Sequence, residues 1–198
     1  TSYLLNVTAP DFEAVDINGK SVRFSDFKGK TVVIDFWFTT CGPCLMSMPD
    51  YNNVATFFKD SANIAVLSVC IDEAKAKKRW KQISRKKSIR SVNLFLDESQ
   101  LKFNNKFYID TIKSFPFYMM IAPDGRILGR AESPHSLVRF TYSAFRATQK
   151  ETVLTSQRDF SNNANSSQDW LKQHYNFLSV HDTGLREAIK KYYSGAAR

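Results

Sequence analysis

Residues 31–38 (TVVIDFWF) are followed, after Thr39 and Thr40, by the tetrapeptide CGPC at 41–44. The first stretch is almost wholly apolar and rich in β-branched and aromatic side chains, which is typical of a strand buried on both faces. Its one charge is Asp35. After the tetrapeptide, apolar residues recur at spacings of three and four as far as residue 58, which predicts a helix that continues past a proline. The tetrapeptide therefore lies between a buried strand and the start of a helix.

Strands and helices alternate along the rest of the first 148 residues. A hairpin is predicted at 12–24, because Asn18 and Gly19 tolerate the positive φ of its turn. The later pattern predicts strands at 64–71, 92–96, 117–121 and 127–130, and helices at 72–87, from Asp97 to about 107, and at 136–148. Gly125 permits the turn between the last two strands. This alternation predicts an α/β sandwich with a mixed central sheet.

The chain has 198 residues, enough for one domain and an appendage. No apolar run approaches 18 residues, and the first residues form no basic and apolar leader, so we expect no membrane span and a leader already removed. The stretch 161–167 (SNNANSS) is typical of a linker, and two amphipathic helical patterns follow it. We therefore predict a domain at 1–148, then a linker and helical C-terminal extension at 149–198.

The net charge of +9 is unevenly placed. Residues 1–72 carry five Lys or Arg and eight Asp or Glu, whereas residues 75–90 alone carry nine cations. On a helix these cations form a solvated outer face, or a surface that attracts an acidic protein or an anionic membrane. No base-reading motif accompanies them, so nucleic acid is not a predicted partner.

The two cysteines of the tetrapeptide differ in their expected environments. Cys41 would face the free N–H groups and positive end of the helix, which favour a thiolate, while Cys44 lies one turn inward. A thiolate paired with a second thiol performs disulfide exchange. The alternative, a zinc half-site, lacks a second Cys/His pair, so no metal is predicted. Cys70, in a buried strand, is expected to act as a small hydrophobe rather than as a third reactive thiol.

Together, these motifs resemble the thioredoxin family. The resemblance is carried by Asp35-Phe36-Trp37 three residues before CGPC, by Phe115-Pro116 before a strand, and by Asp124-Gly125 in the last hairpin. Three earlier stretches, APDF at 9–12, GK at 19–20 and SDFKGK at 25–30, look like its TlpA-like branch of extracytoplasmic thiol–disulfide oxidoreductases. The resemblance covers roughly 7–147 and implies a three-layer thioredoxin-like sandwich with an N-terminal hairpin.

The resemblance also implies residue roles. Cys41 would attack, Cys44 would resolve, and Asp35, a buried acid with a raised pKa, would relay the proton of Cys44. Pro116 would be cis and face the disulfide. The residues expected to contact substrate are Phe38, Thr40, Gly42, Pro43, Phe115 and Pro116. The chain departs from the family at Thr40, where tryptophan is common, and at Phe115, where a small or β-branched residue is common.

The function expected from this resemblance is exchange of a Cys41–Cys44 disulfide with protein cysteines, in the reducing direction and without another cofactor. The implied location is the bacterial periplasm, secreted or tethered, with electrons from a membrane donor. A peroxidase shares the APDF opening but needs a different cysteine motif. The alternative from another class is a binding module that docks an acidic partner or membrane through residues 75–90 and the C-terminal extension.

Overall fold

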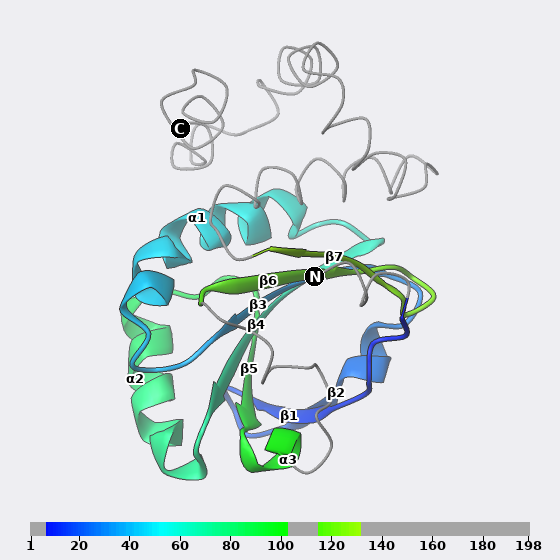
Figure 1. Ribbon diagram of the computed structural model, residues 1–198. Coiled ribbons are helices and arrows are strands. Elements are labelled where there is room, and N and C mark those ends of the chain that lie inside the picture. The colour runs from blue at the N-terminus through cyan, green and yellow to red at the C-terminus, as the bar shows by residue number, and fades with distance from the viewer. Residues whose placement is uncertain (1–6, 103–114, 132–198) are drawn as a thin grey trace.

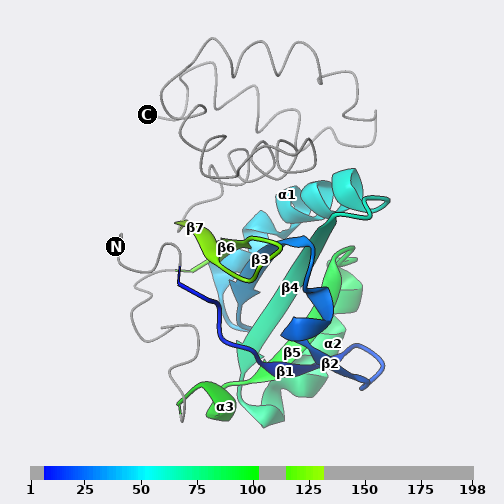
Figure 2. The same ribbon diagram turned by 90° about the vertical axis from the view of Figure 1, so that its right-hand side faces the viewer.

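The computed structural model describes residues 7–102 and 115–131. A seven-stranded sheet in the order β2-β1-β5-β4-β3-β6-β7 lies at its centre (Figures 1 and 2). The strands are β1 (Glu13–Asp16), β2 (Ser21–Arg23), β3 (Thr31–Trp37), β4 (Ile64–Asp72), β5 (Val92–Asp97), β6 (Phe117–Ile121) and β7 (Ile127–Ala131). The helices are α1 (Gly42–Phe58), α2 (Lys77–Lys86) and α3 (Ser99–Lys102), with 3₁₀ turns η1 (Phe24–Phe27) and η2 (Ala74–Ala76).

The sheet is mixed, as predicted, and the fold is thioredoxin-like. Strands β3, β4 and β5 run parallel, while β1 pairs antiparallel with β5, and β6 pairs antiparallel with β3. Parallel strands need crossover connections, and α1 and η2–α2 supply them. The carboxyl ends of β3, β4 and β5 therefore share one edge of the sheet, and the segment 38–44 follows β3 at that edge.

Side chains on the two faces of the sheet form two separate cores. On one face, Trp37 of β3 lies beside Cys70 of β4, which lies beside Phe95 of β5, and α1 and α2 cover them. Figures 1 and 2 show both helices on the same side of the sheet. The other face is lined by aliphatic and aromatic residues such as Ile34 and Leu67 and packs against the N-terminal segment and α3. All seven side chains of β3 are buried, as the apolar run predicts.

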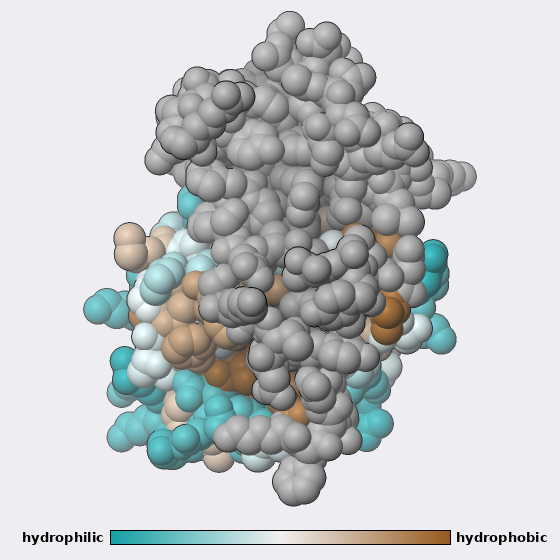
Figure 3. Space-filling model, viewed as in Figure 1, coloured by the Kyte–Doolittle hydropathy of each residue, from teal (hydrophilic) through white to brown (hydrophobic). Residues whose placement is uncertain are grey.

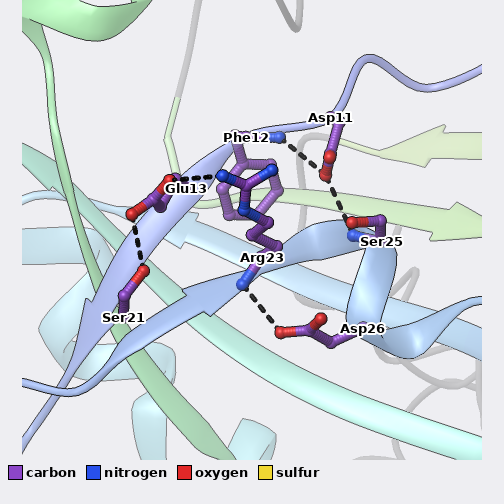
Figure 4. Close-up of polar contacts among 7 residues, drawn as sticks. All are labelled: Asp11, Phe12, Glu13, Ser21, Arg23, Ser25 and Asp26. Atoms are coloured by element: carbon purple, nitrogen blue, oxygen red, sulfur yellow. Dashed lines mark hydrogen bonds and ion pairs between the residues drawn. The ribbon is translucent and has the colours of Figure 1, made fainter.

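Polar contacts hold the N-terminal hairpin together (Figure 4). Glu13 of β1 forms an ion pair with Arg23 of β2 at 3.3 Å and accepts a hydrogen bond from the Ser21 hydroxyl at 2.6 Å. Asp11 accepts hydrogen bonds from the backbone N–H groups of Phe12 and Ser25. The pairing of β1 with β5 attaches the hairpin to the main sheet.

The structure differs from the sequence-based prediction mainly at element ends. The helix predicted at 72–87 starts later, because β4 extends to Asp72, whose Cα pairs with that of Asp97, and η2 precedes α2. Helix α1 continues through Pro49, as predicted. Asp97 accepts a hydrogen bond from the N–H of Ser99 and so caps α3, but the rest of that predicted helix lies outside the described residues.

Three further predictions lie outside the described residues: the helix at 136–148, the domain boundary at 148–149 and the helical C-terminal extension. Within 7–102 and 115–131, no helix is long and apolar enough to cross a membrane.

Candidate active site

A disulfide joins Cys41 and Cys44 at the start of α1. Cys41 is the N-cap of the helix, and its sulfur accepts a hydrogen bond from the N–H of Cys44 at 3.2 Å. The two cysteines differ in access, because Cys41 is 4% exposed whereas Cys44 is completely buried. Gly42 and Pro43 between them are exposed. An incoming thiol or disulfide therefore meets Cys41 first, at a helix end that favours the thiolate.

A buried tryptophan lies in the core beneath the disulfide. Trp37, the last residue of β3, is fully buried in the same cluster as Cys41 and Cys44. Its indole N–H donates to the hydroxyl of Ser68 on β4 at 2.9 Å, so its one polar atom is satisfied. Trp37 therefore packs in the core next to both cysteines.

Asp35 is completely buried, two residues before Trp37 on the same strand face. Neither of its carboxyl oxygens has a hydrogen-bond partner among the described residues. Burial raises the pKa of Asp35 from 3.8 to about 8, because the charged form loses its hydration. Asp35 is therefore neither exposed nor hydrogen-bonded to a described residue.

Two tyrosines, which the sequence analysis did not single out, connect the region of Asp35 to α1. Tyr118 of β6 lies directly opposite Asp35 in the register, so both side chains share the face that α1 covers. Its hydroxyl donates to Ser47 at 3.1 Å, and the Ser47 hydroxyl donates to the carbonyl of Cys44 at 3.0 Å. Tyr51 of α1 stacks on Tyr118 and donates to main-chain carbonyls of the sheet. The phenol group of Tyr118 in the apolar run at 117–121 is a signal that would have identified it, whereas Tyr51 lies among polar residues.

The segments before the disulfide and before β6 contact each other through aromatic rings. Phe38 and Phe115 meet edge-to-face with centroids 5.2 Å apart, and Phe115 also packs against the cluster that contains both cysteines. The Phe115–Pro116 peptide bond is cis, and Pro116 is buried. The structure thus brings together Phe38 and Phe115 of the predicted substrate-contact set, while Thr40 is exposed to solvent.

Apolar surface surrounds this end of the sheet. Figure 3 shows it on the side of the molecule where β3 ends and α1 begins. Met46, in the second turn of α1, is 81% exposed, although methionine is usually buried. The sequence analysis did not single out Met46, because spacing along a helix does not tell which apolar residue is left exposed.

Thr39 attaches the loop before the disulfide to the end of β4. Its hydroxyl donates to a carboxylate oxygen of Asp72 at 2.6 Å, and its N–H donates to the same oxygen at 3.0 Å. Thr39 is 2% exposed, whereas its neighbour Thr40 is exposed. Thr39 therefore has a structural contact that the sequence analysis did not predict.

We expect Thr39→Val to lower the free energy of unfolding by about 2 kcal/mol, because it removes a buried hydrogen bond to a charged acceptor while keeping the side-chain shape. Urea denaturation of the oxidised chain measures this change. Thr40→Val is the matched control and should change stability by less than about 0.5 kcal/mol. Equal effects of the two substitutions would contradict a special role for Thr39.

Cys70 lies in the same buried cluster as the disulfide but is fully enclosed. Burial, and then the charges of Asp72 and Asp35, raise the pKa of its thiol far above the usual range. Cys70 is therefore an inert, protonated side chain, in agreement with its predicted role as a small hydrophobe. Among the residues that the structure describes, no group of His, Cys, Asp or Glu is arranged to hold a metal ion.

Comparison with known proteins agrees with this geometry. The Redoxin family model matches residues 5–137. The thiol-disulfide oxidoreductase ResA of Geobacillus kaustophilus is 37% identical over 75 residues, which is 38% of this chain and 42% of that protein. ResA of Bacillus subtilis is 40% identical over 67 residues, 34% of this chain and 37% of that protein. The matched part thus spans less than half the length of these relatives.

A solved structure resembles the chain over a longer stretch. The thioredoxin domain of a thiol-disulfide oxidoreductase from Bacteroides vulgatus superposes with a TM-score of 0.59 at 25% identity, covering 69% of this chain and 97% of that domain. The matched family model, the sheet order and the helix-capping disulfide agree with one another. The chain therefore belongs to the Redoxin family and is a TlpA-like protein of thioredoxin fold.

Proposed function

We propose that the chain is a thiol–disulfide oxidoreductase that exchanges its Cys41–Cys44 disulfide with protein cysteines, working in the reducing direction. The observation that carries this proposal is the disulfide itself: it caps α1, with Cys41 slightly exposed and Cys44 enclosed. This arrangement separates an attacking sulfur from a resolving one.

In the reduced chain, the Cys41 thiolate attacks one sulfur of a substrate disulfide, and the other substrate sulfur leaves as a thiolate that takes a proton from water. A mixed disulfide now joins Cys41 to the substrate. Cys44 loses its proton and attacks Cys41, so the Cys41–Cys44 bond forms and the substrate leaves with its second thiol. Two electrons have passed from the chain to the substrate.

Asp35 supplies the base for the second step. Burial raises the pKa of Asp35 to about 8, which brings it much closer to the range of a thiol, so a proton passes from Cys44 to Asp35 at a lower cost in free energy than to an ordinary aspartate. An exposed aspartate, with a pKa near 4, would be a far weaker base. The buried carboxyl group is therefore suited to accept the Cys44 proton and to return it in the reverse reaction.

The reducing direction, the periplasmic location and a membrane electron donor rest on the TlpA-like resemblance. A reductase outside the cytoplasm is separated from cytoplasmic reductants, so its disulfide must be reduced again by a partner that carries electrons across the membrane. The relatives that are named thiol-disulfide oxidoreductase ResA agree with this chemistry.

The test is the reduction potential of the Cys41–Cys44 pair, measured by equilibrating the chain in thiol/disulfide buffers, together with turnover of a disulfide-bonded protein. We expect a value near about −270 mV, as for a reductant. A value near about −120 mV would make the chain an oxidant and contradict the proposed direction. Absence of turnover in either direction would favour the binding-module alternative.

A further inference from the structure

The described part of the chain has a helix face with an unusual excess of positive charge. Between residues 74 and 96 the sequence contains no Asp or Glu. We call the following residues of α2 the cationic face: Lys77, Lys78, Arg79, Lys81, Arg85 and Lys86. None of them forms an ion pair with a described residue. Of the acids at the ends of β4 and β5, Glu73 pairs with Lys75, Asp72 accepts hydrogen bonds from Thr39, and Asp97 accepts one from the N–H of Ser99.

The three cations in its first turn do not stabilise α2, whereas Arg85 and Lys86 in its last turn favour the helix dipole. The first turn of α2 contains three cations and no acid, and its N-cap Ala76 provides no side-chain hydrogen bond. Positive charge at the amino end of a helix opposes the macrodipole and costs stability. Lys78 and Arg79, which disfavour their own helix and have no ion-pair partner in the described structure, therefore point to a role outside the fold.

The cationic face lies beside the disulfide. Helix α2 follows the carboxyl end of β4, at the same edge of the sheet as Cys41, and its buried Trp80 belongs to the cluster that contains both active-site cysteines. The Lys77 ammonium group lies 5.6 Å from the ring centroid of Phe95, which belongs to that cluster as well. Figure 3 shows hydrophilic surface over α2 next to the apolar surface at the start of α1.

The composition of this surface favours a protein partner over a membrane or a nucleic acid. A helix that binds in the plane of a membrane inserts apolar side chains into lipid. On α2, Trp80 is fully buried and Ile83 is packed against the core, and the exposed large hydrophobic residues of the described structure all lie elsewhere. The same burial leaves α2 without an exposed aromatic ring on which a base could stack.

We infer that the cationic face of α2 binds an acidic segment of the substrate protein and so selects substrates whose reactive disulfide lies near clustered Asp or Glu residues. This inference rests on the proposed function and adds a substrate class to it. The attraction acts on encounter, so it raises the rate of attack at low salt and leaves the chemistry of the sulfurs unchanged.

The test compares two peptide disulfides that differ only in charge, one flanked by four glutamates and the other by four glutamines. The second-order rate constant of the reduced full-length chain is measured with each peptide at low and high salt. We expect the acidic peptide to react about tenfold faster at low salt and this advantage to disappear in high salt. Lys78→Glu/Arg79→Glu should abolish the advantage and leave the rate with the glutamine peptide unchanged.

The variants are chosen to separate charge from folding. Acids in the first turn of α2 favour the helix, so the double reversal should not unfold the chain, which thermal denaturation checks. The control Lys28→Glu/Lys59→Glu makes the same change in net charge at the opposite edge of the sheet, before β3 and β4, and should keep the preference.

Equal rates with the two peptides at low salt, or an equal loss of preference in the control, would overturn the inference. If the chain also sediments with phosphatidylglycerol vesicles through Lys78 and Arg79 while showing no peptide preference, the face serves a membrane and the inference is wrong. If the chain reacts with neither peptide, the proposed function fails instead, because only that result removes disulfide exchange itself.

Discussion

A Cys41→Ser chain should reduce no protein disulfide, whereas a Cys44→Ser chain should attack once and remain joined to its substrate. The first substitution removes the more exposed cysteine of the pair, so no mixed disulfide forms. The second leaves attack intact but removes the thiol that releases the substrate. We expect turnover to fall at least about a thousandfold in both variants, because each loses a group that forms a covalent bond during the cycle.

The measurement is turnover of a disulfide-bonded protein, followed by non-reducing electrophoresis. The Cys44→Ser chain should show a covalent adduct that disappears on treatment with a small thiol, and the Cys41→Ser chain should show none. Cys70→Ala is the matched control, because it removes a cysteine from the same buried cluster without touching the disulfide. It should retain turnover within about threefold. An adduct formed by the Cys41→Ser chain would show that attack does not begin at Cys41.

The main features of the fold could be predicted because local patterns and the final structure agree. The apolar run of β3 predicts a strand buried on both faces, and all seven of its residues are buried. The Asn18-Gly19 turn has Gly19 at φ 88°, as its hairpin requires. In the candidate site, sequence order alone predicts that Cys41 and Cys44 lie at the start of a helix, just after a buried strand that ends at Trp37.

The parts that could not be predicted depend on contacts between distant segments. Thr39 meets Asp72 from 33 residues away, and Tyr118 meets Ser47 from 71 residues away. Sequence periodicity cannot predict such pairs, because each segment would show the same pattern if its hydroxyl group had no partner. The start of α2 was misplaced for the same reason: β4 is extended by pairing with β5, and that pairing overrides the helical pattern that begins at Asp72.

The second large effect concerns the stability of the chain as the pH rises. In the folded chain the pKa of Asp35 is raised to about 8, while in the unfolded chain it is near 3.8. Between these two values the unfolded state has lost the proton and the folded state has kept it, so the free energy of unfolding falls by about 1.4 kcal/mol per pH unit. Below pH 3.8 the contribution is absent, and above about 8 the full cost, roughly 6 kcal/mol, has been incurred.

Asp35→Asn removes this cost because the amide is uncharged at every pH. We expect the oxidised variant to match the unaltered chain near pH 4 and to exceed its free energy of unfolding by roughly 6 kcal/mol at pH 9. Urea denaturation from pH 4 to 9 measures the difference. Asp60→Asn makes the same substitution at an exposed position, and its stability should run parallel to that of the unaltered chain. Parallel curves for Asp35→Asn as well would contradict a buried, protonated Asp35.

The same substitution separates stability from catalysis. Without the Asp35 carboxylate, Cys44 has no base for its proton, so the mixed disulfide should persist and its resolution should slow by about a hundredfold. In the unaltered chain the rate of resolution should rise with pH up to about 8, the pKa of Asp35, and this dependence should be lost in Asp35→Asn. A variant that is more stable at high pH yet slower would show that the chain retains a destabilising buried acid for proton transfer. A stable variant with an unchanged rate would leave Asp35 no part in the reaction.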